Sequence, residues 1–172
     1  MGDKFIKLDL SQAYQQMQVH PSSKELVNMN THKGLFRYTG LPFGVASIPV
    51  ILQRAIDNIL QAIFQVHCYI DNILILGSND HDCLKNLKEI LQRLHKNGIT
   101  VKKSKCFFLQ DSVEYFGHAL DKEGSHAAPE KLKAIQEAPT PINIRELRSC
   151  LGLIISMHGF KWIWCKDCQK AF

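Results

Sequence analysis

The sequence lacks any apolar stretch that approaches the length needed to cross a bilayer. It also lacks a secretory leader, because residues 1–4 lead directly into a short strand-like run. Its six cysteines have neither the density nor the spacing of a secreted disulfide framework. We therefore expect a protein of the cytoplasm or nucleus that is not secreted and has no membrane partner.

Cysteine pairs at metal-binding spacing are also scarce. Cys165 and Cys168 form a single Cys-x-x-Cys pair, and His158 is a conceivable third zinc ligand. Structural zinc usually takes four ligands, and no second pair stands at the required spacing. The pair alone is therefore weak support for a zinc site.

Repeats and low-complexity tracts are absent too, and the remaining composition is typical of a globular protein. Hydrophobic residues make up 45% and charged residues 22% of the 172 residues, which is enough for one domain with a sizeable core. Lys and Arg outnumber Asp and Glu by 21 to 16. This balance fits a polyanionic partner such as a nucleic acid, and it fits equally a slightly basic protein without one.

Short strands joined by turns are predicted along most of the chain. Alternating apolar residues in FIKLD predict a strand that ends at Asp9. Further strand-like runs are ELVNMNT and LFRYT around a turn at Gly34, VHCYI and ILIL around Asp71, and then ITV, CFFL, VEYF and HAL. Because several of these runs are linked as hairpins, we expect a mainly antiparallel sheet.

Helical periodicity predicts two long amphipathic helices. The first starts favourably at Ser47, as the cap, and Pro49, and its apolar residues recur up to Ile63. The second carries leucines over residues 84–94 and ends before Gly98.

Two shorter helices are predicted near the end of the chain. One runs between Pro129 and Pro139, and the other starts at a capping-box pattern of Asn143 and Glu146. Residues 139–141 are the best candidate for a domain boundary. Strands and helices alternate irregularly, so the predicted class is α+β.

Two acidic residues each follow an apolar run, Asp9 after FIKL and Asp71 after HCYI. If the two strands are neighbours, both carboxylates point to one place, where they can bind a hard cation such as magnesium. Two such ions can hold the attacking and leaving oxygens of a phosphoryl transfer. On these residues alone, an ordinary role in turns is the more common one, since turns are rich in Asp.

Four segments in a fixed order favour the catalytic interpretation. They are FIKLDLSQAYQQMQV, THKGLFRYTGLPFGVASIPVILQR, CYIDNILIL and VEYFGH. In order and spacing they resemble the palm motifs of reverse transcriptases, above all those of gypsy-type LTR retrotransposons. The resemblance runs from Lys4 to about Leu153 and returns over KWIWCKDCQKAF. It implies a palm-type, mainly antiparallel sheet packed on helices.

The resemblance also implies three segments. Residues 1–120 would be the palm with a remnant of the fingers, residues 121–158 a partial, thumb-like helical segment, and residues 159–172 the start of a connection or ribonuclease H-like region. The partners it implies are an RNA or DNA primer–template and a dNTP.

Site residues are implied in the same way. Asp9, Asp71 and Asn72 match catalytic positions, with Asp9 and Asp71 as ligands of two magnesium ions. Tyr14 resembles the aromatic residue that blocks a ribose 2′-hydroxyl. The implied substrate-binding residues are Leu10, Tyr14, Phe43, Gly44, Gln53 and Tyr69, and the implied primer-binding residues are Phe116, Gly117 and His118.

Departures from the family pattern bear on activity. The signature Tyr-x-Asp-Asp reads Tyr69-Ile70-Asp71-Asn72, so one carboxylate is an amide. At about 4 Å and an effective dielectric constant near 20, a unit charge against a dication is worth very roughly 8 kcal/mol before desolvation. In addition, most of the fingers would precede Asp9 and are not found in this sequence.

We therefore expect a reverse transcriptase domain fragment that performed two-metal nucleotidyl transfer by ancestry and has lost it. A non-catalytic nucleic-acid-binding module and the product of a decayed reading frame are the alternatives.

Overall fold

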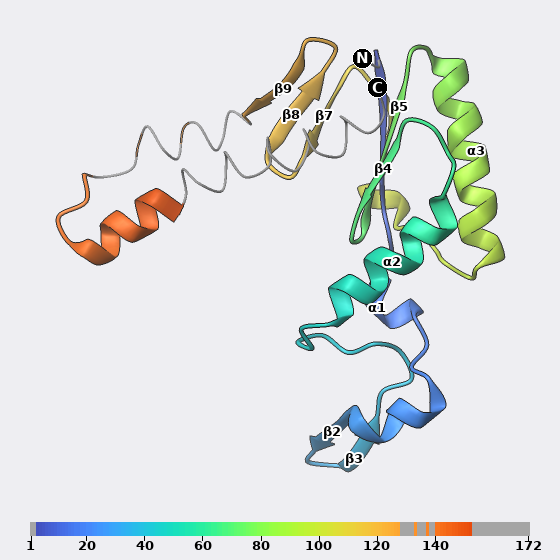
Figure 1. The fold of residues 1–172 in the computed structure, drawn as a ribbon, viewed down its shortest axis with the longest axis vertical. Helices are drawn as coiled ribbons and strands as arrows, with labels where there is room; N and C mark the ends of the chain where they lie inside the picture. The colour runs from blue at the N-terminus through green and yellow to red at the C-terminus, as the bar shows by residue number, and fades with distance from the viewer. Residues whose placement is uncertain (1–2, 128–132, 134–136, 138–139, 153–172) are drawn as a thin grey trace. The chain divides into compact units, whose positions relative to one another are not determined.

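The computed structural model describes residues 3–127, 133, 137 and 140–152 (Figure 1). The chain divides into two compact units, Met1–Asp111 and Ser112–Phe172. Each unit is described separately below. Among the described residues, no helix combines the length and the apolar character that a membrane span requires.

A four-stranded sheet in the order β4-β5-β1-β6 forms the centre of the first unit. Its strands are β1 (Lys4–Asp9), β4 (Val66–Tyr69), β5 (Asn72–Gly77) and β6 (Phe107–Gln110). Every neighbouring pair is antiparallel, as the hairpin-linked pattern predicts. The strand ending at Asp9 therefore lies directly beside the strand that follows Asp71.

Two amphipathic helices pack on this sheet, α2 (Ile48–Leu60) and α3 (Asp80–Lys96). In Figure 1, α3 runs alongside the strands and α2 crosses near one end of them. The core consists of fully buried aliphatic side chains from the two central strands and both helices. They are Ile6, Leu8, Leu52, Ile56, Ile73, Ile75, Ile90 and Leu94. Burying such side chains is the main source of the unit's stability.

The helix ends differ in part from expectation. Ser47 occupies the cap position of α2, but its side chain makes no capping hydrogen bond because its backbone is already helical (φ −81°, ψ −17°). The predicted start of the helix at Ser47 is therefore confirmed without a side-chain cap, and the helix stops at Leu60, before Ile63. The helix α3 is capped by the Asn79 side chain and is followed by Gly98 with φ +70°, which confirms its predicted end.

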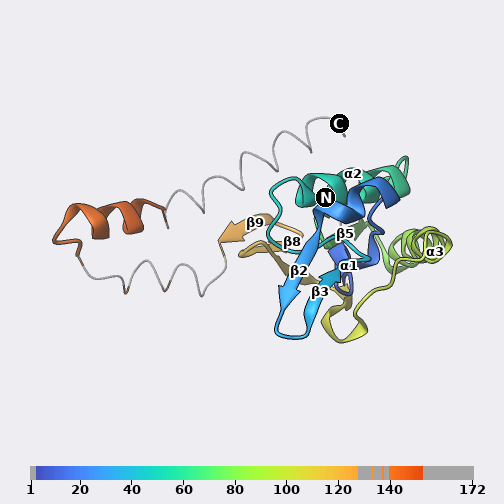
Figure 2. The same ribbon diagram turned by 90° about the horizontal axis from the view of Figure 1, so that it is seen from below.

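A small antiparallel hairpin extends the first unit beyond the sheet (Figure 2). It consists of β2 (Asn28–Thr31) and β3 (Gly34–Arg37) and follows the short helices α1 (Ala13–Gln16) and η1 (Pro21–Leu26). Gly34 has φ +114°, so the turn uses a conformation that favours glycine, as predicted.

The second unit contains an antiparallel meander, β7-β8-β9, and a helical segment over residues 144–152. The strands are β7 (Ser112–Tyr115), β8 (His118–Asp121) and β9 (Gly124–Ala127). The predicted capping box is confirmed, because the backbone N–H of Glu146 donates to Asn143 Oδ1 at 2.9 Å and Asn143 Nδ2 donates to Glu146 Oε1 at 2.7 Å.

Several predictions fall outside the described residues. The helix expected over residues 129–139 lies almost wholly outside them, as do His158 and the cysteine pair of the possible zinc site. The same holds for the predicted segment 159–172.

Candidate functional site

The antiparallel register of β1 and β5 brings the two predicted acidic residues to one end of the sheet. Asp9, the last residue of β1, lies opposite Asn72, the first residue of β5. The backbone N–H of the next residue, Leu10, donates to the Asp71 carbonyl at 2.8 Å. Asp9 and Asp71 thus occupy adjacent strand ends, which is the neighbourhood that the predicted cation site requires.

Each of these carboxylates contacts a donor from within the chain. Oδ2 of Asp9 lies 3.7 Å from Nζ of Lys105, and the Asp9 side chain is only 14% exposed. Oδ1 of Asp71 accepts a hydrogen bond of 2.9 Å from Nδ2 of Asn72. Asn72 therefore serves Asp71 as a neutral donor at the position where a carboxylate would add a negative charge.

Oxygen donors of this kind fit one hard cation. Magnesium prefers carboxylate and carbonyl oxygens, and Asp9 and Asp71 supply two carboxylates at neighbouring positions. No group of three or more His, Cys, Asp or Glu side chains suited to a metal ion occurs in the part of the chain that the structure describes. A second cation would meet no third carboxylate in this group of described residues, because the Asn72 side chain is an amide.

The turn that presents Asp71 is braced from α2. Gln53 Oε1 accepts a hydrogen bond of 2.7 Å from the backbone N–H of Ile70, and its Nε2 donates to the Cys68 carbonyl at 3.0 Å. Ile70 has φ +56°, a left-handed conformation that is costly for a β-branched residue. Gln53, which the family resemblance placed among substrate-binding residues, engages the backbone of this hairpin in the structure.

Tyr14 and Phe43 form an aromatic pair, and Tyr14 lies within the electrostatic influence of Asp71. The rings of Tyr14 and Phe43 meet edge to face, with centroids 5.4 Å apart and an interplanar angle of 89°. Burial raises the pKa of the Tyr14 phenol, and the charges of Asp71 and Tyr69 raise the same pKa further. These influences place Tyr14 in the electrostatic neighbourhood of Asp71.

The loop before α2 supports this aromatic pair. The backbone N–H of Leu41 donates to the carbonyls of Tyr14 (3.2 Å) and Met17 (3.0 Å). Phe43 is 66% exposed, and Gly44 has φ +89°, a conformation open to glycine. Leu10, by contrast, is buried, and its backbone carbonyl is its only oxygen donor because its side chain is a hydrocarbon.

The three predicted primer-binding residues lie in the second unit. Phe116 and Gly117 form the tight turn between β7 and β8, with φ values of +51° and +73°. Phe116 packs edge to face on Tyr115, with centroids 4.6 Å apart, and His118 is buried. The structure thus places these residues together on one hairpin.

Lys105 is the residue that sequence reasoning did not assign to the site. It lies in a basic segment, KKSK, at residues 102–105. In the structure this segment forms the 3-10 turn η2 (Lys103–Lys105), from which Lys105 reaches Asp9. No periodicity in the sequence signals this, because the contact depends on an irregular stretch beside β1.

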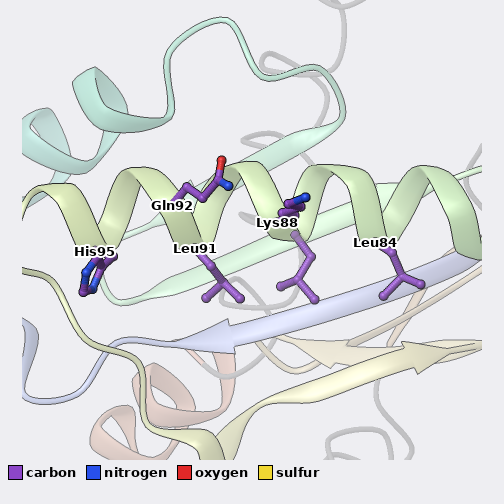
Figure 3. Close-up of a pocket in the computed structure, with 6 residues that line it drawn as sticks. Leu84, Lys88, Leu91, Gln92 and His95 are labelled. Atoms are coloured by element: carbon purple, nitrogen blue, oxygen red, sulfur yellow. The ribbon is translucent and has the colours of Figure 1, made fainter.

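A pocket along α3 is separate from these residues (Figure 3). Its volume is about 410 Å³. It is lined by Leu84, Leu87, Lys88, Leu91, Gln92 and His95, all from α3. None of the predicted site residues is among them.

Residues 2–120 match the family described as reverse transcriptase (RNA-dependent DNA polymerase). The chain belongs to the reverse transcriptase family. The resemblance inferred from the ordered motifs is therefore confirmed.

Retrotransposon polyproteins are among the relatives of this reverse transcriptase domain. It is 34% identical over 151 residues to the retrovirus-related Pol polyprotein from transposon gypsy of Drosophila melanogaster, covering 87% of this chain and 15% of that protein. Its sequence identity to the retrovirus-related Pol polyprotein from transposon opus of the same organism is 36%, with the same coverage of both chains. The Tf2-7 polyprotein of Schizosaccharomyces pombe is 30% identical over 158 residues, covering 91% and 12%. The chain thus spans 12–15% of the length of these relatives.

Solved structures show the same fold. A foamy viral protease-reverse transcriptase in complex with double-stranded DNA matches with a TM-score of 0.84 and 23% identity, covering 88% of this chain and 27% of that one. The complex of that protein with an RNA/DNA hybrid matches with a TM-score of 0.79 and 23% identity, covering 88% and 21%. The predicted α+β fold with a mainly antiparallel sheet is confirmed.

Proposed function

We propose that this chain is a reverse transcriptase palm that binds a primer–template and one divalent cation, and whose nucleotidyl transfer is reduced below detection. The observation that supports this most is the register of β1 and β5, in which Asp9 faces Asn72 and adjoins Asp71. Two neighbouring carboxylates fit a cation, and the amide beside them removes the charge that a second cation requires.

Magnesium is the proposed cation, held by Asp9 and Asp71 with the Leu10 carbonyl as a proposed third donor. When bound, such a cation polarises phosphate oxygens and neutralises the charge that develops in phosphoryl transfer. The chain's own contribution is to hold the cation's two carboxylate ligands in place. The β1–β5 ladder positions Asp9, and the Gln53 brace on the hairpin positions Asp71.

The Tyr14–Phe43 pair is proposed to select the sugar of an incoming dNTP. Both rings are rigid and apolar, and their edge-to-face contact holds each of them in one orientation. The face of a rigid ring in this place would leave a ribose 2′-hydroxyl no room. Gly44 and Tyr69 complete the proposed substrate contacts.

Primer contact is proposed for the β7–β8 turn of the second unit. Phe116 and Gly117 both have positive φ, so this turn presents backbone groups in a tight bend. Backbone donors and acceptors suit a primer end, because they recognise the sugar and phosphate rather than a base. Nucleic acid is bound by the foamy viral structures that share this fold, and we extend that property to this chain as part of the proposal.

Binding of a fluorescently labelled primer–template to the full chain tests the proposal. We expect measurable affinity that falls steeply between roughly 50 and 200 mM salt, because phosphate contacts release counterions. A blunt duplex of the same length is the matched control and should bind more weakly, since it lacks a recessed primer 3′ end beside a template overhang. No binding at low salt would contradict the proposal. It would favour the alternative that the chain is the product of a decayed reading frame.

Primer extension tests the second half of the proposal. With magnesium or manganese, we expect no incorporation above that of the Asp9→Asn variant. Incorporation by the natural chain that clearly exceeds this control would show that transfer has been retained despite Asn72.

A further inference from the structure

Lys105 forms an ion pair with one of the proposed cation ligands. Its Nζ lies 3.7 Å from Oδ2 of Asp9. The two side chains differ in exposure, since 14% of Asp9 is exposed against 58% of Lys105. The carboxylate is thus held within the protein, while the lysine has a path to solvent. Such a pair can open without unfolding, because only the lysine side chain has to move.

Backbone contacts on both sides keep Lys105 in this place. Before it, the N–H of Lys102 donates to the Asp9 carbonyl at 2.8 Å. After it, the chain rejoins β1 at Phe107, where β6 begins. Between Lys102 and Phe107, the turn η2 interrupts the pairing of this segment with β1. Lys105 therefore lies on a short segment that is bound to β1 on both sides, and β1 is the strand that carries Asp9.

The charges around the site make this lysine a competitor for cations. Asp9 and Asp71 are the acidic groups, Asn72 is neutral, and Lys105 is positive. A dication at these carboxylates would meet the Lys105 ammonium as a like charge at close range. The ammonium and the dication therefore cannot both occupy the same oxygen of Asp9 at low energy.

We infer that Lys105 is the resident counter-ion of Asp9 and sets the affinity of the site for divalent cations, which bind Asp9 once the ammonium has moved away. The inference rests on the proposed function in one respect, namely that Asp9 and Asp71 bind a divalent cation. The internal ion pair compensates the charge of the largely enclosed carboxylate in the cation-free chain. A higher cation concentration is consequently needed to fill the site.

Manganese binding to the full chain, without nucleic acid or nucleotide, tests this inference. Free Mn²⁺ is followed by electron paramagnetic resonance during a titration. The Lys105→Met variant keeps the apolar stem and removes the charge, so we expect the Mn²⁺ dissociation constant to fall roughly three- to tenfold. Lys105→Arg keeps the charge and should retain the original constant.

Lys103→Met is the matched control. It removes the same charge from the same turn, and no ion pair between Lys103 and a carboxylate is found within the described residues. An unchanged constant in Lys105→Met would overturn the inference, and so would an equal fall in Lys103→Met. In an Asp9→Asn background, the effect of Lys105→Met should disappear.

A double-mutant cycle without metal provides a second readout. In EDTA, the urea midpoints of Asp9→Asn, Lys105→Met and the double variant should be non-additive, because each single change removes the same ion pair. Additive midpoints would overturn the inference, as would a failure of every variant to bind Mn²⁺. Primer–template binding separates the two proposals: its loss in the natural chain contradicts the proposed function, whereas the manganese result for Lys105→Met decides the inference.

Discussion

The side chain of Gln53, in the first turns of α2, accepts a hydrogen bond of 2.7 Å from the backbone N–H of Ile70. Ile70 adopts φ +56° in the turn that leads to Asp71. A β-branched residue in this conformation persists only where its surroundings hold it there. The Gln53 amide supplies such support, since it also donates to the Cys68 carbonyl at 3.0 Å.

Replacing Gln53 should therefore affect both the stability and the cation site. We expect Gln53→Ala to lower the free energy of unfolding by about 1–3 kcal/mol, because it leaves a half-buried N–H of the turn without its partner. It should also weaken Mn²⁺ binding, since Asp71 follows the turn directly. Urea denaturation followed by circular dichroism and an Mn²⁺ titration measure the two effects.

The matched control is Asn58→Ala, an exposed position on the same helix. It should change the free energy of unfolding by no more than about 0.5 kcal/mol. Equal effects of the two substitutions would mean that the brace contributes nothing to the hairpin.

Much of this architecture is predictable from the sequence, because hydrophobic periodicity directly reflects which face of an element is buried. The alternation in FIKLD predicts β1, and the apolar runs around Asp71 predict the β4–β5 hairpin. The β9 strand is not predictable in this way. Its sequence, GSHA, has no apolar alternation, and it is a strand because β8 offers it a partner.

The contacts that tune the site are less predictable than the strands. Gln53 and Ile70 are 17 residues apart, and nothing local distinguishes this glutamine from a solvent-facing one. Lys105 reaches Asp9 because η2 interrupts the pairing with β1, and the three lysines of its run have equivalent sequence surroundings. Both contacts arise from tertiary geometry, which periodicity does not encode.

A carboxylate at position 72 should strengthen cation binding. At about 4 Å, a unit charge and a dication interact by about 2 kcal/mol even with water-like screening, which corresponds to about thirtyfold in affinity. Asn72→Asp also removes the Nδ2 donor from Oδ1 of Asp71. We therefore expect at least roughly tenfold tighter Mn²⁺ binding, measured by paramagnetic resonance.

The control for this substitution is Asn58→Asp, which changes the net charge equally at an exposed position of α2. It should alter the Mn²⁺ dissociation constant by less than about twofold, because solvent and salt screen a distant charge. If both variants tightened binding to the same degree, the effect would belong to the net charge and not to the site.

A substitution at Gly40 tests the close packing of the loop that supports Tyr14. A Cβ at this position would collide with the backbone carbonyl of Gln15, and backbone atoms cannot move aside as a flexible side chain can. Gly40→Ala should thus lower the free energy of unfolding by about 1–3 kcal/mol. Gly152→Ala is the control, since a Cβ there meets nothing within 4 Å, and it should leave stability unchanged or slightly raised. Equal midpoints in urea would contradict this close approach.

Cys68, in the strand before the Asp71 turn, links stability to alkaline pH. Burial raises the pKa of its thiol to about 12, and the charges of Asp57 and Asp71 add to this effect. The thiol of the unfolded chain ionises near its ordinary pKa of 9.0. Between these values the unfolded state loses a proton that the folded state keeps. The contribution to stability is therefore complete below pH 9 and is lost as the pH rises toward about 12.

Cys68→Ala removes this source of pH dependence. Its free energy of unfolding should fall less steeply above pH 9 than that of the natural chain, in urea titrations performed at a series of pH values. Lysines and tyrosines ionise in both proteins, so their influence cancels in the comparison. Cys106→Ala, which removes a thiol outside the hairpin, serves as the control. Parallel pH profiles for the natural chain and Cys68→Ala would show that this thiol is open to water, and that the hairpin carrying Asp71 is less tightly packed than the structure describes.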